Sequence, residues 1–409
     1  MAKRVINNSY FTFASLAKNI SHYFNYTLSL FKDGYMLIKS RHLFITFSLL
    51  SIFSVTGCAH KTSNVAIQDD NVFTLAFASC ARENQPQPIW TEIAKVDPEV
   101  FLYIGDNVYA DVYEVNGKRS MQPVTTRARF DEAYAQANAI PEFAAFREQV
   151  PVMLGSWDDH DYGKNDGGKE FLMKKESQQA FLDFFEFSKD DPIRQQEGIY
   201  QSRMFNDGGR QVQIIVLDTR YHRDALNKNP DGRPQNKGPY LPATDNSATI
   251  LGDEQWLWLS KQLEKPADVR LIVTSIQIVA YEHSWEGWGM FPHERDRMYQ
   301  LITDKQANGI VFISGDRHLM EISKDEGQLG HKVPYPIWDF TSSDITRTFS
   351  EVNEDNSFRQ GPVVRDTNFG EIVVNWADDT LDSNIVLTAR DRNGDVLNQQ
   401  IVSLRDLQM

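Results

Sequence analysis

The sequence predicts an α/β protein whose parallel strands end at a shared edge. Three short apolar runs, at residues 100–104, 151–154 and 310–313, each border a glycine and lead into a cluster rich in Asp, Asn or His. Short apolar runs bounded by glycine are typical of buried strands. A strand, helix and strand also alternate between residues 72 and 104, which favours parallel pairing. Because ligands bind beyond the carboxyl ends of strands in open α/β sheets, the three clusters predict a polynuclear metal site.

The other elements continue this alternation along the chain. We expect strands at residues 72–78, 211–217 and 269–274, and helices at residues 87–95, 125–148, 177–187, 251–263 and 294–302. The helix at 87–95 carries Ile89, Trp90 and Ile93 on one stripe, as an amphipathic helix requires. Residues 227–247 are rich in Pro, Asn and Gly and predict a long loop, which is often a binding loop.

Two further segments leave alternatives open. The aromatic-rich residues 281–292 predict a loop near the site that binds an apolar part of a diester or a lipid, or else packs in the core. Strands are expected at residues 371–376, 384–389 and 399–404, with the last two joined around Asn393 and Gly394. Asn-Gly between two such runs is a strong hairpin signal. The aspartates of this turn also have the spacing of a calcium loop, but the downstream Glu is missing, which favours the hairpin.

Composition and charge exclude some classes of function for this chain. The chain has 409 residues with 41% apolar content, enough for one large domain or two ordinary ones. Counted from Cys58, it keeps 36 basic and 55 acidic residues, a formal charge of −19. This balance argues against nucleic-acid binding, which needs a basic footprint. It would also repel anionic substrates unless bound cations reverse the local field.

The N-terminal region predicts export and a lipid anchor. Lys39 and Arg41 precede an apolar run at residues 43–57, which is too short for a comfortable membrane span and resembles an export signal. Residues 55–58 read VTGC and resemble a bacterial lipobox, in which Cys58 becomes the lipidated first residue. A plain signal peptide or signal anchor is the alternative. In a Gram-negative cell, Ala59 after Cys58 would favour the outer membrane.

The start of the chain is also open to question. Residues 1–35 do not resemble the start of an export signal, whereas Met36 lies just before Lys39, so we expect translation to begin at Met36. The predicted organisation is a signal region at 1–57, a polar tether at 58–71 and one domain at 72–409 that ends in the β-hairpin.

The side chains after the predicted strands have the chemistry of metal ligands. Asp106 can bridge two cations, and a tight turn would aim Tyr109 at the same centre. Asp159 and His160 are adjacent, so one can ligate while the other meets substrate. We expect Asp316 and His318 to share one face of an extended backbone. Gln277 would add an amide oxygen and Cys80 a thiolate, although a buried core thiol is the alternative for Cys80.

These motifs resemble the alkaline phosphatase D-like (PhoD-like) metallophosphatases of the calcineurin-like metallophosphoesterase superfamily. The matching segments are FASC at 77–80, GDNVYAD at 105–111, WDDHDYGKND at 157–166, LDTRYHR at 217–223, SIQ at 275–277 and SGDRH at 314–318. They occur in the family order and cover roughly residues 72–375. The resemblance implies a four-layer α/β/β/α metallophosphoesterase sandwich and metal-dependent hydrolysis of phosphate esters.

The resemblance also implies roles for individual residues. Asp106 would bridge the metals, and Cys80 and Tyr109 match positions that bind ferric iron. Asp159 and His160 take the places of Asn and His in the superfamily's Gly-Asn-His-Glu motif. Asp316 and His318 match its Gly-His-x-His motif, and Gln277 occupies the slot of another ligand His. His160 would protonate the leaving group or contact the phosphoryl oxygens.

Two departures from the family pattern matter. Asn107 stands where some members have a substrate-binding Arg, so Arg220 or Arg317 is expected to do that work. For Arg220, a structural salt bridge to Asp218 or Asp224 is the alternative. The first strand begins at residue 72, which leaves no room for the separate N-terminal β-domain of some members.

The ligand types favour mixed metals. Thiolate and phenolate suit Fe³⁺, whereas carboxylate and amide oxygens suit Ca²⁺, with Zn²⁺ or Mn²⁺ as alternatives. A phosphodiesterase or phospholipase on the same site is an alternative activity. A metal-stabilised lipoprotein that binds without catalysis is the alternative from another class.

Overall fold

The computed structural model describes residues 71–346 and 352–409, whose long strands form two six-stranded sheets. The first sheet has the order β16 (Val396–Ser403), β15 (Asn384–Asp391), β14 (Asn368–Asn375), β1 (Val72–Ala78), β2 (Val100–Ile104) and β5 (Val152–Ser156). The second sheet has the order β12 (Met320–Asp325), β13 (Ile337–Ser342), β11 (Ile310–Ser314), β10 (Val269–Val273), β7 (Arg210–Val216) and β6 (Gln201–Asp207).

Each sheet contains a parallel block. In the first sheet, β1, β2 and β5 are parallel, and in the second sheet β7, β10, β11 and β13 are parallel. The strands outside these blocks pair antiparallel with their neighbours. Each connection between neighbouring parallel strands contains a helix, except that from β11 to β13, which contains β12. The carboxyl ends of each block therefore meet at one edge.

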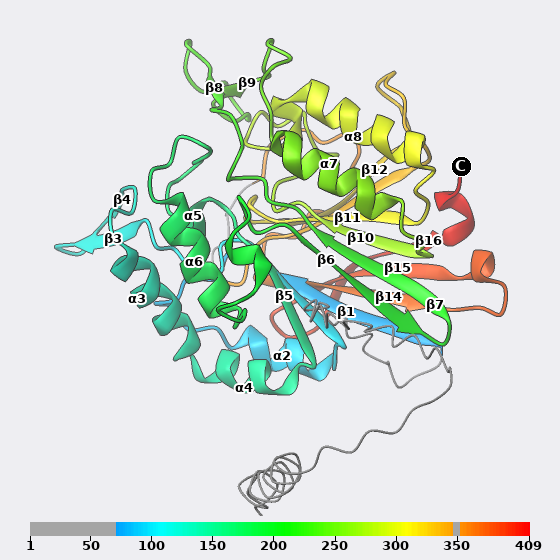
Figure 1. Ribbon diagram of the computed structural model, residues 1–409, viewed down its shortest axis with the longest axis horizontal. Coiled ribbons are helices and arrows are strands. Elements are labelled where there is room, and N and C mark those ends of the chain that lie inside the picture. Colours follow the sequence, from blue (N-terminus) through cyan, green and yellow to red (C-terminus); the bar gives the residue numbers. More distant parts are fainter. Residues whose placement is uncertain (1–70, 347–351) are drawn as a thin grey trace, which may run out of the picture. The chain divides into compact units, whose positions relative to one another are not determined.

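Helices cover the outer faces of the two sheets. Figure 1 shows α7 (Gly252–Leu263) and α8 (Pro292–Lys305) on the outer side of the second sheet, and α2 (Ile89–Lys95) and α4 (Pro141–Gln149) beside the first. The other helices are α3 (Arg127–Asn138), α5 (Asp159–Tyr162) and α6 (Lys174–Phe184). The predicted α/β/β/α sandwich is thus confirmed.

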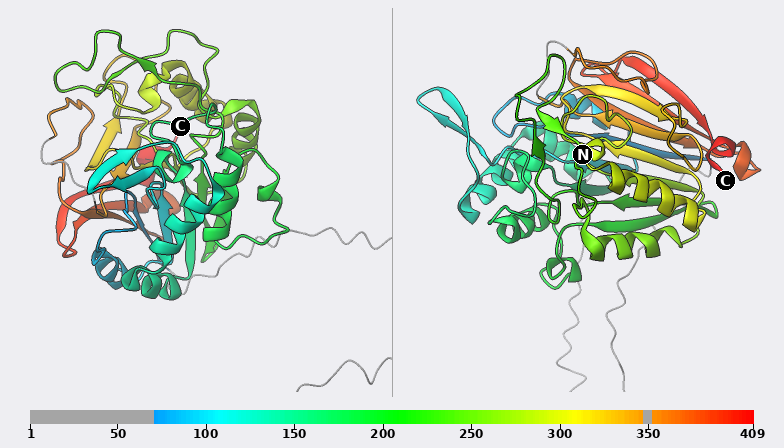
Figure 2. Two further views of the ribbon diagram at one scale, coloured as in Figure 1. Left: turned by 90° about the vertical axis from the view of Figure 1, so that its left-hand side faces the viewer. Right: turned by 90° about the horizontal axis from the view of Figure 1, so that it is seen from above.

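Smaller elements lie in the connections. Two-stranded ribbons are formed by β3 (Val112–Val115) with β4 (Lys118–Met121) and by β8 (Asn227–Lys228) with β9 (Tyr240–Leu241). In Figure 1 and in the right-hand view of Figure 2, the β3–β4 hairpin projects from the body of the molecule. Short 3₁₀ helices occur at Pro192–Arg194, Trp288–Met290, Thr380–Asp382 and Leu404–Leu407.

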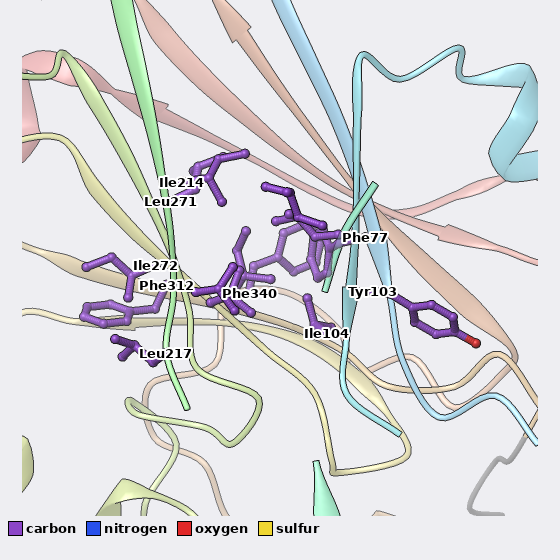
Figure 3. Close-up of a cluster of buried hydrophobic side chains, with 14 of the residues drawn as sticks. Phe77, Tyr103, Ile104, Ile214, Leu217, Leu271, Ile272, Phe312 and Phe340 are labelled. Atoms are coloured by element: carbon purple, nitrogen blue, oxygen red, sulfur yellow. The ribbon is translucent and has the colours of Figure 1, made fainter. Parts of the chain in front are cut away.

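The core between the sheets is built from large apolar side chains. Phe77 of the first sheet meets Phe340 of the second edge to face, with ring centroids 4.8 Å apart, and both side chains are fully buried. Figure 3 shows these two residues with Ile214, Leu271 and Phe312 of the second sheet. Gly370 lies opposite Phe77 on the neighbouring strand, where a Cβ would come within 2.1 Å of the Phe77 ring. Glycine at this position lets the ring lie across β14.

Several predicted elements differ from the structure in their bounds. The helix expected over 125–148 is divided into α3 and α4, because Pro141 disfavours a helical conformation at Ile140, whose ψ is 117°. The predicted hairpin at the C-terminus is β15 and β16. At its turn, Asp391 Oδ1 accepts from the backbone N–H groups of Asn393 and Asp395 at 2.8 and 3.0 Å. This carboxylate caps the turn, as the hairpin interpretation requires.

The predicted signal region and the tether up to residue 70 lie outside the described residues and stay predictions. Over residues 71–346 and 352–409, no helix combines the length and apolar character needed to cross a membrane.

Candidate metal centre

Every candidate ligand follows the carboxyl end of a parallel strand. Cys80 comes after β1, Asp106 and Tyr109 after β2, Asp159 and His160 after β5, Gln277 after β10, and Asp316 and His318 after β11. The two parallel blocks therefore supply all of these side chains from strand ends. All of these residues except Asp316 are buried, and Asp316 is half-buried.

The backbone at these strand ends is left-handed at non-glycine residues. The φ angles are +62° at Cys80, +49° at Asp106, +67° at Asp316 and +50° at His318. This conformation costs an L-residue free energy and clusters at functional sites. The extended backbone expected between Asp316 and His318 is therefore wrong, since both residues lie in a tight, left-handed segment.

A chain of contacts joins β1, β2, β11 and β13 at this edge. The Cys80 thiol lies 3.5 Å from Asp106 Oδ2 and 3.1 Å from Ser343 Oγ. Ser343 Oγ in turn accepts from the backbone N–H of His318 at 2.8 Å. Burial, and then the charge of Asp106, raises the pKa of the Cys80 thiol well above its ordinary value. A thiolate at this position needs a cation beside it.

Asp159 links two groups of possible ligand atoms. One group contains Asp106, Asp159 and His160, and the other contains Asp158, Asp159 and Asp316. Within each group the ligand atoms all lie within 4.8 Å of one another. Distances of this size fit neighbouring cations that share a ligand. The structure thus brings Asp106, Asp159, His160 and Asp316 together.

His160 is held in a carboxylate-rich pocket. Its Nδ1 lies 2.7 Å from Asp111 Oδ1, and its ring lies 4.3 Å from the Tyr109 ring between centroids. Burial alone would lower the pKa of His160, but the charges of Asp159, Asp106 and Asp111 raise it well above its ordinary value. Asp111 was within the GDNVYAD motif but was not predicted as a site residue. Its position five residues after Asp106 was the available signal.

The site contains more negatively charged side chains than its positively charged side chains can balance. Burial, followed by Asp159 and Asp158, raises the pKa of Asp106 despite the opposing effect of His160. Burial and the charges of Asp158, Glu286 and Asp159 likewise raise the pKa of Asp316. By contrast, His160 and Arg220 outweigh burial and hold the pKa of Asp159 at about 2. A cluster of this kind is stabilised when cations bind it.

Buried ligand atoms give a direct test of whether these residues fit metal ions. Asp158 Oδ2, Asp159 Oδ1 and Gln277 Oε1 are buried and have no hydrogen-bond partner among the described residues. Leaving such acceptors unpaired is costly, and oxygen-ligated cations satisfy them. The residues present therefore fit a metal centre.

A third acidic group adjoins this centre. Asp159, Asp166 and Glu286 also offer carboxylate oxygens within 4.8 Å of one another. Burial, then Glu286 and Asp159, raises the pKa of Asp166 to about 7. Glu286 belongs to the aromatic-rich segment 281–292, in which Trp288 and Met290 are buried and Trp285 is half-buried. Glu286 was not predicted as a site residue, because aromatic residues dominate that segment of the sequence.

Arg220 does not have the contacts expected of a substrate-binding arginine. Its guanidinium is fully buried and pairs with Asp158 and, at 2.8 Å, with Glu286. The structural alternative therefore describes its contacts better, although its side-chain partners are not the expected Asp218 or Asp224. The Asp218 carboxylate accepts instead from the backbone N–H of Arg220 at 2.8 Å. Arg220 thus fixes Asp158 and Glu286 beside the centre.

Arg317 and Asn107 have defined partners as well. Arg317 pairs with Glu354 at 2.6 Å and lies over the Trp285 ring, 5.1 Å from its centroid. Asn107 Nδ2 donates to the Ser156 carbonyl at 2.9 Å and to Asp161 at 2.5 Å. Asn107 therefore connects the segments after β2 and β5. Of the two predicted arginines, Arg317 is the one that directly adjoins a candidate ligand in sequence, Asp316.

Gly105 allows the strand ends to approach. Its φ is +106°, and a Cβ there would lie 2.6 Å from Asp158 Cβ. Any other residue would push the segment after β2 away from the one after β5. The glycine that bounds this strand thus brings Asp106 close to Asp158.

The comparisons agree with this geometry. Residues 75–381 match the family model of the PhoD-like phosphatases. The chain belongs to this family. Among PhoD-like relatives, alkaline phosphatase D of Bacillus subtilis (strain 168) is 26% identical over 291 residues, which are 63% of this chain and 48% of that protein. The match thus spans about half the length of the relative.

Solved structures share the fold of this PhoD-like chain. The structure of PhoD has a TM-score of 0.62 at 19% identity and covers 83% of this chain and 72% of that chain. The purple acid phosphatase PPD1 from yellow lupin (Lupinus luteus) seeds has a TM-score of 0.50 at 15% identity, covering 83% of this chain and 55% of that chain. At these identities the likeness establishes the metallophosphoesterase fold.

Proposed function

We propose that this PhoD-like chain hydrolyses phosphate esters at the centre around Asp106 and Asp159. The observation that carries the proposal is that the group of Asp106, Asp159 and His160 shares Asp159 with the group of Asp158, Asp159 and Asp316. When bound there, metal ions lower the pKa of water and stabilise the attacking and leaving oxygens. The chain itself has a formal charge of −14, so cations are also needed to attract an anionic ester.

The side chains of this chain have separate parts in the reaction. Asp106, Asp159, Asp316 and His318 would hold the cations, and Arg220 keeps Asp158 in place through their buried ion pair. Asp111 fixes the His160 ring at Nδ1, so that Nε2 is the atom able to give a proton to the leaving group. Arg317 is the guanidinium proposed to contact the phosphoryl group.

The metals proposed are Fe³⁺ and Ca²⁺, with Zn²⁺ or Mn²⁺ as alternatives. Cys80 and Tyr109 would ligate the iron, and the carboxylates with the Gln277 amide would ligate calcium. Metal analysis and a visible spectrum of the purified protein test this assignment. A phenolate on ferric iron colours the protein, so a colourless, iron-free and active preparation would remove the iron from the proposal.

Hydrolysis is tested with the purified chain, each cation in turn, and two substrates. p-Nitrophenyl phosphate reports monoesterase activity, and bis(p-nitrophenyl) phosphate reports the diesterase alternative. Asp106→Ala should abolish both activities while the variant still folds, as measured by circular dichroism. If wild-type protein loaded with iron and calcium hydrolyses neither ester, the alternative of a non-catalytic, metal-stabilised lipoprotein is favoured.

We also propose export with a lipid anchor at Cys58. The support is the basic start, the apolar run at 43–57 and the VTGC segment. Membrane fractionation and mass spectrometry of the mature N-terminus test it in the native cell. Cys58→Ser should release the protein from the membrane fraction, whereas an unlipidated wild-type chain would contradict the proposal.

A further inference from the structure

The amide of Gln277 can ligate a cation only through its oxygen, and its orientation is set from outside the metal centre. Its nitrogen, Nε2, donates to Glu321 Oε1 and to Thr341 Oγ1, both at 2.8 Å. Its oxygen, Oε1, is buried and has no partner in the part of the chain that the structure describes. The two ends of one amide therefore have opposite environments.

The Glu321 carboxylate determines whether the nitrogen or the oxygen of the Gln277 amide lies against it. An ionised carboxylate accepts hydrogen bonds and cannot donate them, so only the amide nitrogen can lie against it. Thr341 does not impose this choice, because a hydroxyl both donates and accepts. Glu321 lies on β12, is 3% exposed, and pairs through Oε2 with Arg359 Nε at 2.7 Å. Arg359 thus holds the carboxylate that orients the amide.

The backbone around Gln277 is held just as firmly. Asp339 of β13 accepts from the N–H groups of Ile278 and Val279 at 2.9 and 3.1 Å. The carbonyl of Gln277 accepts from Trp288 at 2.9 Å. Two residues earlier, Ser275 Oγ donates to Asp158 Oδ1 at 3.0 Å, which ties this segment to the acidic cluster. With the backbone fixed, rotation of the amide is the freedom that remains.

We infer that Glu321 is a positioning residue that makes Gln277 an oxygen ligand. This role rests on the proposed function. It adds that the position of Gln277 favours a hard cation with oxygen ligands, such as Ca²⁺. Partners that orient a metal ligand commonly change metal affinity by 10- to 100-fold when they are removed. Without Glu321, the Gln277 amide can rotate and turn its nitrogen toward the cation. The NH₂ group of an amide is not a metal ligand, so calcium binding weakens.

Calorimetric titration of the metal-stripped full chain with Ca²⁺ tests the inference. Glu321→Ala should raise the calcium dissociation constant by about 10- to 100-fold. Glu321→Gln should recover only part of this loss, because its amide can present either oxygen or nitrogen to Gln277 and has one oxygen to share between Gln277 and Arg359. Glu371→Ala is the matched control, since Glu371 Oε2 pairs with Arg390 Nε at the same 2.7 Å in the other sheet. This control should shift the constant less than about 2-fold.

The outcomes separate the inference from the proposed function. Unchanged calcium affinity in Glu321→Ala, or an equal loss in Glu371→Ala, would overturn the role of Glu321. If Glu321→Ala does not fold, Glu321→Gln and Thr341→Val carry the test: Glu321→Gln should weaken calcium binding more than Thr341→Val, which leaves the carboxylate in place. Equal losses in the two variants, or a larger loss in Thr341→Val, would contradict the inference. The proposed function fails separately, if the loaded wild-type chain hydrolyses no phosphate ester.

Discussion

The contact between Asp111 and His160 yields the sharpest test of the proposed chemistry. Both side chains are buried, and Asp111 Oδ1 lies 2.7 Å from His160 Nδ1. A hydrogen bond to a charged group contributes about 1.5–3 kcal/mol. At about 1.4 kcal/mol for each tenfold in rate, Asp111→Asn should lower kcat by about 10- to 150-fold. Asparagine keeps the size of the side chain but removes the charge that stabilises a protonated ring.

The assay compares two esters that differ in their need for a proton. An alkyl phosphate has a poor leaving group that must be protonated, whereas p-nitrophenyl phosphate releases a stable anion. We therefore expect the larger loss with the alkyl ester. In a His160→Asn background, Asp111→Asn should have little further effect, because the two residues act as one unit. Equal losses with both esters, or additive losses in the double variant, would refute the reasoning.

A control variant separates this effect from general damage. Asp183 is a partly exposed aspartate of α6 that pairs with Arg127 at 2.8 Å, away from the strand ends. Asp183→Asn should change kcat less than about 2-fold, since its ion-pair partners Arg127, Lys189 and Arg194 are not candidate site residues. A loss comparable to that of Asp111→Asn would mean that charge removal disturbs the whole fold.

Three further predictions concern stability. Phe340→Ala should lower the free energy of unfolding by about 3–5 kcal/mol in urea titrations, because it removes the fully buried ring that meets Phe77; a loss below about 1 kcal/mol would contradict this packing. Gly105→Ala should destabilise more than Gly209→Ala, since both positions have positive φ but only Gly105 also faces a close neighbour; equal melting temperatures would be evidence against the clash. Burial, with a smaller contribution from Arg317, holds the pKa of His283 well below its ordinary value, so the folded protein keeps this ring neutral. Because this ring takes up a proton below about pH 6.5 in the unfolded chain, its contribution to stability should fall as the pH drops there, so wild type should lose stability relative to His283→Asn between pH 7 and pH 5 in melting experiments; an unchanged difference would contradict this.

The sequence predicted the parallel blocks well, because their strands are short apolar runs with glycine beside them. β1 and β2 have the expected bounds, and β11 extends one residue further, to Ser314. Strands β6, β12 and β13 were not predicted. β6 mixes polar and apolar residues, and β12 and β13 contain Glu321 and Asp339 as buried charges, which disguises their periodicity. Glu321 and Asp339 are tolerated in the core because partners distant in sequence, such as Arg359 for Glu321 and the backbone of Ile278 for Asp339, contact them in the folded structure.

The candidate site was predictable where motif residues follow a strand directly, and less so where support comes from elsewhere. Asp106, Asp159 and Asp316 could be named because each one lies just beyond an apolar run. Glu286 and Glu321 could not be, because nothing near them in the chain indicates that they contact Arg220 or Gln277. Contacts between residues distant in sequence depend on how the loops cross the sheet edge, and local patterns do not carry that information.

The backbone conformation and the charge of the site have a common explanation. Left-handed φ at Cys80, Asp106 and His318 is unfavourable on its own, and so is a set of buried carboxylates with too few positive partners. Both costs become acceptable if bound cations draw the same groups together, because ligation satisfies the acceptors and fixes the backbone that carries them. Removal of the metals should therefore loosen the segments after β1, β2 and β11 together while the core around Phe77 and Phe340 stays packed.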